Sequence, residues 1–154
     1  LKLSGRPPQG WHTKSSTSTF TSDLLIEHGG FIYDSNSYND DIPYVIRRND
    51  RKFVIIPYSF DTNDMRFDGN NGFVQGNDFN IYCKESFNQL LSETDDGSLR
   101  MMSIGLHPRI IGRPGRIKGL EDFIKHIKTY QNVWIPTRID IAKHCLEKDL
   151  FNFF

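Results

Sequence analysis

The sequence predicts an α/β fold with a parallel sheet, and two observations support this. Short apolar runs rich in β-branched and aromatic residues recur along the chain, separated by segments whose apolar residues fall at three- and four-residue spacings. The chain has 154 residues, 37% of them hydrophobic and 25% charged, which fits one globular domain and excludes a disordered or collagen-like class.

The predicted strands are the apolar runs. Continuous apolar runs are typical of strands buried on both faces of a parallel sheet. The runs are residues 31–33, 53–56, 101–106 and 133–135, and an earlier strand is expected to end near Trp11. Residues 34–50 and 57–76 are rich in Asp, Asn, Gly and Tyr, so we expect them to form long loops of functional interest.

Helices are predicted between these runs. Thr21–His28 has hydroxyl and acidic residues at its start and Gly29 just past its end, which are helix start and stop signals. Asn77 is expected to cap a second helix whose apolar stripe forms core. A third helix is expected over residues 119–130, and a fourth from Thr137, with Asp140 three residues on as in a capping box.

Charge and cysteine content narrow the function classes. The 19 basic and 19 acidic residues balance, so no overall electrostatic attraction to nucleic acid or to an acidic membrane surface is expected. No run of 18 apolar residues and no signal peptide is visible, and the start at Leu1 suggests a piece of a longer protein. Cys83 and Cys145 have no metal-ligand spacing, which favours reduced core thiols and a cytoplasmic location.

Polar residues follow the predicted strands, and in parallel α/β folds the active site lies at the carboxyl ends of the strands. A carboxylate beside an imidazole is a common pair for general acid and base chemistry. The candidates, in chain order, are Trp11, His12, Asp34, Asp61, Asp64 and His107. We predict that Asp34, Asp61 and His107 lie in one pocket at the carboxyl ends of the strands.

Four of these candidates also have a structural interpretation. Asp34, followed by Ser35 and Asn36, has the pattern of a turn cap. His107, before Pro108, also fits a core histidine. Asp61 and Asp64 also fit solvated loop acids, and the sequence leaves these alternatives open.

Three arginines lie in the stretch HPRIIGRPGR, directly after a predicted strand. Arg109, Arg113 and Arg116 can bind an anion from a loop at a strand end. The alternative is that the glycines and prolines shape a turn while the arginines pair with Asp residues of the long loops.

Five motifs resemble the polysaccharide deacetylase superfamily with the NodB homology domain, within it the branch that holds metal-independent allantoinases and certain peptidoglycan deacetylases. The motifs occur in order and nearly span the chain. They are GRPPQGW at 5–11, GGFIYDSNSYNDDIPY at 29–44, IPYSFDTNDMRF at 56–67, SIGLHPRIIGRPGR at 103–116 and VWIPTRIDIAKH at 133–144.

The resemblance implies the carboxy-terminal part of an irregular (β/α) barrel with parallel strands, so residues 1–154 are expected to be the carboxy-terminal half of the catalytic domain. It implies that Arg6 orients a catalytic acid and that His107 is the general acid that protonates the departing nitrogen. Asp34, Asp61 and Asp64 resemble the motif that shapes the pocket. Trp11, His12 and Arg113 are expected to contact substrate. At position 12 the allantoinase branch usually has tyrosine.

The sequence is compatible with three functions. The first is an allantoinase-like hydrolase that opens a cyclic amide to a linear ureide acid, in purine catabolism. The second is a deacetylase of N-acetylglucosamine units in chitin or peptidoglycan, in carbohydrate metabolism. The third is an inactive assembly module. We expect amide hydrolysis in the whole protein and inactivity of this chain alone, because the motifs with the catalytic aspartate and metal-binding histidines are absent from it.

The same resemblance implies partners and cofactors. The amino-terminal half of the domain is expected to cover the exposed sheet edges, and the whole protein is expected to be a homo-oligomer. No metal ligand is assigned within this chain; a divalent metal, where the reaction uses one, is expected in the amino-terminal half.

Overall fold

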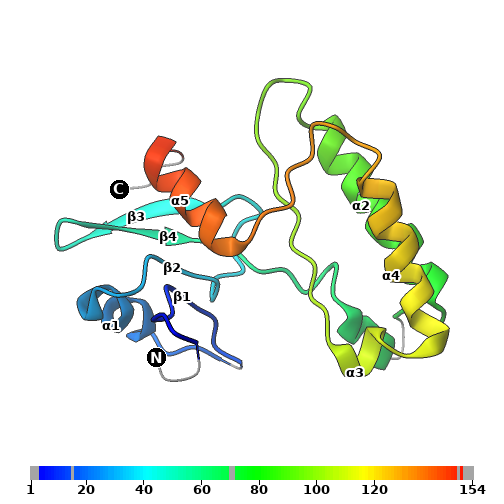
Figure 1. Ribbon diagram of the computed structural model, residues 1–154, viewed down its shortest axis with the longest axis horizontal. Coiled ribbons are helices and arrows are strands. Elements are labelled where there is room, and N and C mark those ends of the chain that lie inside the picture. The colour runs from blue at the N-terminus through cyan, green and yellow to red at the C-terminus, as the bar shows by residue number, and fades with distance from the viewer. Residues whose placement is uncertain (1–3, 15, 70–71, 149, 151–154) are drawn as a thin grey trace. The chain divides into compact units, whose positions relative to one another are not determined.

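The chain folds into two compact units, as a computed structural model shows for residues 4–14, 16–69, 72–148 and 150 (Figure 1). The sheet unit comprises Leu1–Tyr58 with Pro136–Phe154, and the helical unit comprises Ser59–Ile135. Within the described residues, no helix is both long and apolar enough to span a bilayer.

The sheet unit contains a mixed four-stranded sheet with the order β1-β2-β4-β3. Its strands are β1 (Gly10–Trp11), β2 (Tyr33–Asp34), β3 (Tyr44–Arg48) and β4 (Arg51–Ile55). β1 pairs with β2, and β2 with β4, in parallel, whereas β3 and β4 run antiparallel. The expected parallel sheet is therefore correct for three strands and wrong for β3, and the described residues form an open sheet and no closed barrel.

The hairpin between β3 and β4 explains this difference. Asn49 and Asp50 both have positive φ, 49° and 61°, the conformation that a two-residue hairpin turn requires. Asn and Asp tolerate this region better than most residues. The prediction that residues 34–50 form a loop is wrong for 44–48, because the Asn-Asp pair closes a hairpin there.

Two helices pack on the sheet, one on each face (Figure 1). Leu25 and Ile26 of α1 (Thr21–His28) pack with Phe53 and Ile55 of β4. Alternate residues of the strands point to the opposite face, and α5 (Arg138–Lys148) contacts β3 and β4. The stop signal of α1 and the cap signal before α5 are confirmed. The start of α1 differs, because its N-cap residue is Phe20 and no side-chain cap hydrogen bond forms there. Gly29 is left-handed at φ 76° and ends α1, and the Asp140 carboxylate accepts hydrogen bonds from the Thr137 hydroxyl at 2.5 Å and the Thr137 amide at 3.2 Å.

The helical unit is built on two helices that lie side by side, α2 (Gly76–Ser92) and α4 (Pro114–Ile127) (Figure 1). The predicted stripe of α2 is confirmed as core: Phe79, Cys83 and Phe87 are buried against Phe123. The cap is different from the predicted Asn77. The Asp78 carboxylate accepts hydrogen bonds from the amides of Val74 and Gln75, both at 2.8 Å, and Gln75 is the N-cap.

The arginine stretch is helical, where the sequence predicted a loop. α3 (Pro108–Ile111) and the first turn of α4 both begin with proline, whose fixed φ suits the first helical position. Before α3, a short 3-10 helix, η1 (Asp64–Asp68), interrupts the predicted loop 57–76.

The stretches 101–106 and 133–135 are extended but form no strand ladder among the described residues. The first makes one parallel bridge, Asn63 to Gly105. In it the Asp64 amide donates to the Gly105 carbonyl at 3.0 Å, and the Gly105 amide to the Thr62 carbonyl at 3.1 Å. The two predicted strands are thus wrong for the described chain, because a strand requires a neighbour along its length.

Both cysteines are free and buried. Burial raises the pKa of the Cys83 thiol to about 12 and also raises the pKa of Cys145. Both side chains therefore act as small apolar core residues, as the sequence predicted.

α2 and α4 approach closely at two glycines, and this contact gives a stability prediction. A Cβ on Gly119 would overlap the Gly76 carbonyl, whereas a Cβ on Gly115 would meet nothing within 4 Å. We expect Gly119→Ala to lower the free energy of unfolding by about 1–3 kcal/mol through overpacking. Gly115→Ala, in the same helix, is the matched control and should raise it by about 0.4–1 kcal/mol. Urea unfolding measures both, and equal effects would contradict the close approach.

Candidate active site

A buried carboxylate, Asp64, lies at the centre of the helical unit's polar contacts. Its side chain is fully buried. Its Oδ2 accepts hydrogen bonds from the amide of His107 at 2.6 Å and from the amide of Ile111 at 3.2 Å, and its Oδ1 lies 2.7 Å from Nδ1 of His107. Burial alone would destabilise the charged form of this carboxyl group, and the backbone amides and the imidazole supply the hydrogen bonds that compensate.

The chain positions this pair from two sides. Asn63 begins η1 by accepting a hydrogen bond from the Met65 amide at 2.8 Å, and the bridge to Gly105 fixes the stretch before His107. His107 is the N-cap residue of α3, and its carbonyl accepts from the amides of Ile110 and Ile111. Asp64 and His107, 43 residues apart in sequence, are therefore brought together by the backbone on both sides.

The pair has a defined proton arrangement. A carboxylate accepts hydrogen bonds, so Nδ1 of His107 carries the proton that points to Asp64. Nε2 is then the ring nitrogen left for chemistry, and the His107 side chain is 28% exposed. A partly exposed imidazole that a buried acid orients through one nitrogen is the arrangement of a general acid or base.

Asp61 is placed differently. Its carboxylate accepts a hydrogen bond from the Tyr82 hydroxyl at 2.5 Å and lies 3.4 Å from the Arg66 guanidinium. The hydrogen bond to Asp61 raises the pKa of Tyr82. Arg66 in turn stacks on the rings of Phe73 and Tyr82. Asp61 therefore orders this surface cluster, and a substrate contact by Asp61 stays a prediction.

In the sheet unit, Asp34 lies at the end of β2 and is 1% exposed. Its carboxylate accepts hydrogen bonds from the Ser22 hydroxyl at 2.6 Å and from the Asn36 amide at 3.1 Å. The second bond is the turn cap that the sequence suggested as an alternative. The prediction that Asp34 lies in one pocket with His107 and Asp61 stays a prediction, because Asp34 belongs to the other unit.

The other predicted residues of the sheet unit lie near its surface. His12 is exposed, its Nδ1 lies 2.7 Å from the Ser35 carbonyl, and its ring packs on Tyr58. Trp11 is 44% exposed and contacts Phe31 edge to face. Arg6 is exposed. The catalytic and substrate-binding roles expected of these three residues stay predictions.

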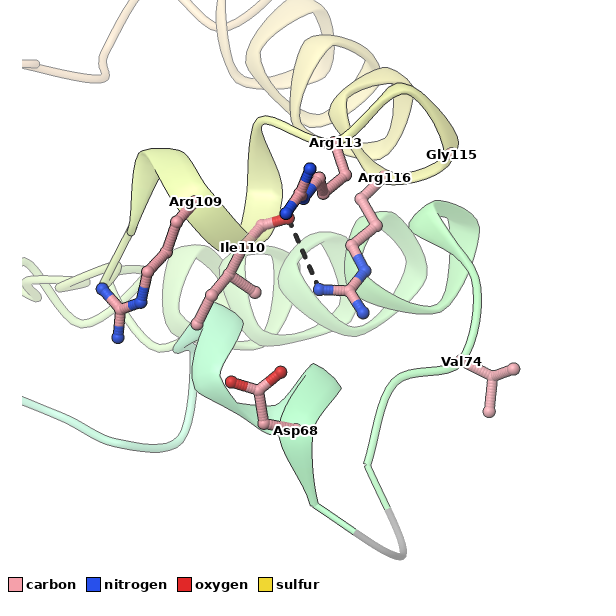
Figure 2. A pocket seen from close by; sticks show the side chains of 7 residues that line it. All are labelled: Asp68, Val74, Arg109, Ile110, Arg113, Gly115 and Arg116. Atoms are coloured by element: carbon pink, nitrogen blue, oxygen red, sulfur yellow. Dashed lines mark hydrogen bonds between the residues drawn. The ribbon is translucent and has the colours of Figure 1, made fainter.

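Arg113 lies at a pocket of about 540 Å³ in the helical unit, shown in Figure 2. Arg109 and Arg116 line the same pocket. Sequence reasoning singled out these arginines but missed that they line one open pocket at η1, α3 and the start of α4.

Metal-ligating side chains do not gather in threes anywhere in the part of the chain that the structure describes. In the Asp64–His107 pair, both Asp64 oxygens are occupied by backbone amides and the imidazole. We therefore assign no step of a reaction to a metal held by these residues.

A buried carboxylate paired to a histidine is a common arrangement for general acid or base chemistry. The chain is also similar in sequence and in fold to known proteins. The chain is 42% identical to the crystal structure of Puue allantoinase, with a TM-score of 0.87 over 95% of this chain. It is 41% identical to a polysaccharide deacetylase structure from Pseudomonas aeruginosa, with a TM-score of 0.88 over 97% of this chain.

A Schizosaccharomyces pombe protein that carries the name polysaccharide deacetylase is 38% identical over an alignment of 120 residues, which covers 72% of this chain. No family model matches the chain. The chain belongs to the structural family of polysaccharide deacetylases and Puue allantoinase. It spans 38% of the Schizosaccharomyces pombe protein and about half of the two crystal-structure chains, 48% and 50%.

Histidine tautomers test the Asp64–His107 geometry. We expect neutral His107 to carry its proton on Nδ1, because Asp64 accepts there. His28 is the matched control and should carry its proton on Nε2, because its Nδ1 accepts from the Gly30 amide at 3.3 Å. Two-bond ¹⁵N–¹H imidazole spectra distinguish the two. The same tautomer at both residues would contradict the pairing.

Proposed function

We propose that the chain is part of a hydrolase that cleaves a carbon–nitrogen bond of an amide, with His107 as general acid. The single observation that supports this most is the 2.7 Å contact between Nδ1 of His107 and the fully buried Asp64 carboxylate. In amide hydrolysis, water forms a bond to the carbonyl carbon and the bond from that carbon to nitrogen breaks. The departing nitrogen needs a proton, which the doubly protonated His107 ring supplies from Nε2.

Asp64 is a positioning residue in this proposal. It fixes the ring through Nδ1 and the backbone through the amide of His107, so the ring cannot turn without breaking a buried contact. Water activation and oxyanion stabilisation are assigned to no residue of this chain, and we propose that the amino-terminal half of the domain supplies them, with or without a divalent metal.

The first candidate substrate is a cyclic amide that opens to a linear ureide acid, as in an allantoinase. Identity does not separate the candidates, since the allantoinase and deacetylase structures are 42% and 41% identical. Residues 60–67 and the arginine stretch resemble the allantoinase branch most closely, and this resemblance favours the cyclic amide. The deacetylase names of two relatives favour the alternative, removal of acetyl groups from N-acetylglucosamine units.

A second half of the domain is the partner that we propose for this chain. The extended stretches 101–106 and 133–135 form no ladder with described residues, and Trp134 and Ile135 of the second stretch are 59% and 63% exposed. Exposed apolar side chains on a segment outside any strand ladder favour coverage by further chain. A homo-oligomer of the complete protein is part of the same proposal.

Turnover of the complete protein tests the proposed acid. We expect His107→Ala to lower kcat on the hydrolysed substrate by about 100- to 10,000-fold, the usual effect of losing a general acid. His126→Ala is the matched control: His126 lies on α4, where its ring approaches Asn88, and the variant should stay near parental activity. Allantoin opening and acetate release from N-acetylglucosamine oligomers are measured side by side.

Activity of His107→Ala within a few-fold of the parent would assign His107 to structure. Parental protein that hydrolyses neither substrate would favour the inactive assembly module.

A further inference from the structure

The pocket between η1, α3 and α4 has a strongly cationic lining (Figure 2). Its volume is about 540 Å³, within the range of small-molecule sites. Arginines supply three of its side chains, and Asp68 is the one acid among its lining residues. The remaining lining residues are Val74, Ile110 and Gly115.

The alternative interpretation of the stretch required ion pairs between these arginines and the acids of the long loops. Among the residues that the structure describes no such ion pair forms, and Asp68 of residues 57–76 offsets only part of the arginine charge at the pocket. Asp61 pairs with Arg66, and Asp64 is buried with His107. Arg109 and Arg113 are exposed and make no ion pair with any residue that the structure describes. Two guanidinium groups at this pocket therefore have their donors available.

Arg116 is held in place by its neighbours. Its guanidinium lies 4.5 Å from the centre of the Phe67 ring, and its Nη1 donates to the Ile110 carbonyl at 3.5 Å, the dashed line in Figure 2. A stacked guanidinium keeps most of its donors for a further partner. The pocket thus combines one guanidinium group that is held in place, that of Arg116, with two that are exposed, those of Arg109 and Arg113.

The first turn of α4 adds to this positive field. A helix N-terminus favours negative charge, yet this turn contains no acidic residue and contains Arg116 instead, with Arg113 at the N-cap. The helix dipole disfavours cations at this turn, and a bound anion would offset that effect. Gly115 leaves open space beside the backbone of this turn, so a ligand can approach it closely.

We propose that this pocket binds the phosphate group of a small molecule. Three arginines less Asp68 give a charge of about plus two, which a phosphate dianion balances, and guanidinium groups match its oxygens in pairs. The volume exceeds that of phosphate alone and leaves room for an organic remainder. The proposal stands apart from the hydrolase assignment, since it concerns binding without turnover.

Calorimetry on the complete protein tests it, at constant ionic strength, with inorganic phosphate, glycerol 3-phosphate and acetate as probes. We expect saturable binding of phosphate and weaker binding of acetate. Arg109→Gln and Arg113→Gln should each raise the Kd for phosphate at least about tenfold. Asp68→Asn should lower it, because it removes the opposing charge. Tighter binding of glycerol 3-phosphate than of phosphate identifies an ester as the ligand, and equal binding identifies the free anion.

Lys128→Gln is the matched control, because it removes one exposed positive charge at the other end of α4. Its Kd for phosphate should stay within twofold of the parent. No binding of either phosphate probe at millimolar concentration would overturn the proposal. An equal loss of phosphate affinity in Lys128→Gln and Arg113→Gln would also overturn it, because it would show general charge attraction. Unchanged phosphate affinity in both arginine variants would overturn it as well. Circular dichroism confirms that each variant is folded.

Discussion

The arrangement of the candidate site in the helical unit depends on the hydrogen bonds that the buried Asp64 carboxylate accepts. It accepts hydrogen bonds from two backbone amides of the α3 region and from the His107 ring, while its own amide bonds to Gly105. A charge with no solvent exposure is stable only with such partners, and losing them is costly. The start of η1, the extended stretch before His107 and the short helix after it are therefore fixed by one side chain.

This arrangement links the candidate acid to the arginine pocket through the chain itself. α3 begins directly after His107, and two of its four residues, Arg109 and Ile110, line the pocket. A four-residue helix has little stability of its own. Its position is set by Asp64 on one side and by the buried side chains of Ile110 and Ile111 on the other. The site and the pocket thus share one small structural element.

Local patterns predicted the elements that local interactions determine. The Gly29 stop, the apolar stripe of α2 and the Thr137–Asp140 cap depend on neighbouring residues, and all three are present. The strands predicted at 101–106 and 133–135 depend on distant partners, and a single-sequence pattern cannot supply these. The Asn49–Asp50 hairpin was missed because residues rich in Asp and Asn usually mark loops, although positive φ at both residues produces a turn between paired strands.

The candidate site also combines features that local sequence predicts with features that only the fold determines. His107 and Asp64 were both singled out from their places after predicted strands, but their contact joins residues 43 apart and needs the fold. Asp61, three residues before Asp64, has the same residue type and yet pairs with Arg66 and Tyr82. Burial distinguishes the two acids: Asp64 is fully buried, and the Asp61 side chain is 59% exposed. The spacing of residues in the sequence does not predict this difference in burial.

Hydrogen exchange measured on Asp64→Asn in the complete protein tests the central role of this carboxylate most directly. The substitution keeps the size of the side chain but leaves one oxygen where two accepted three donors. We predict that peptides covering residues 105–113 exchange at least about tenfold faster, while peptides covering 77–91 of α2 exchange as in the parent. Unchanged exchange over 105–113 would contradict the account, because it would show that α3 and the His107 backbone are held without Asp64.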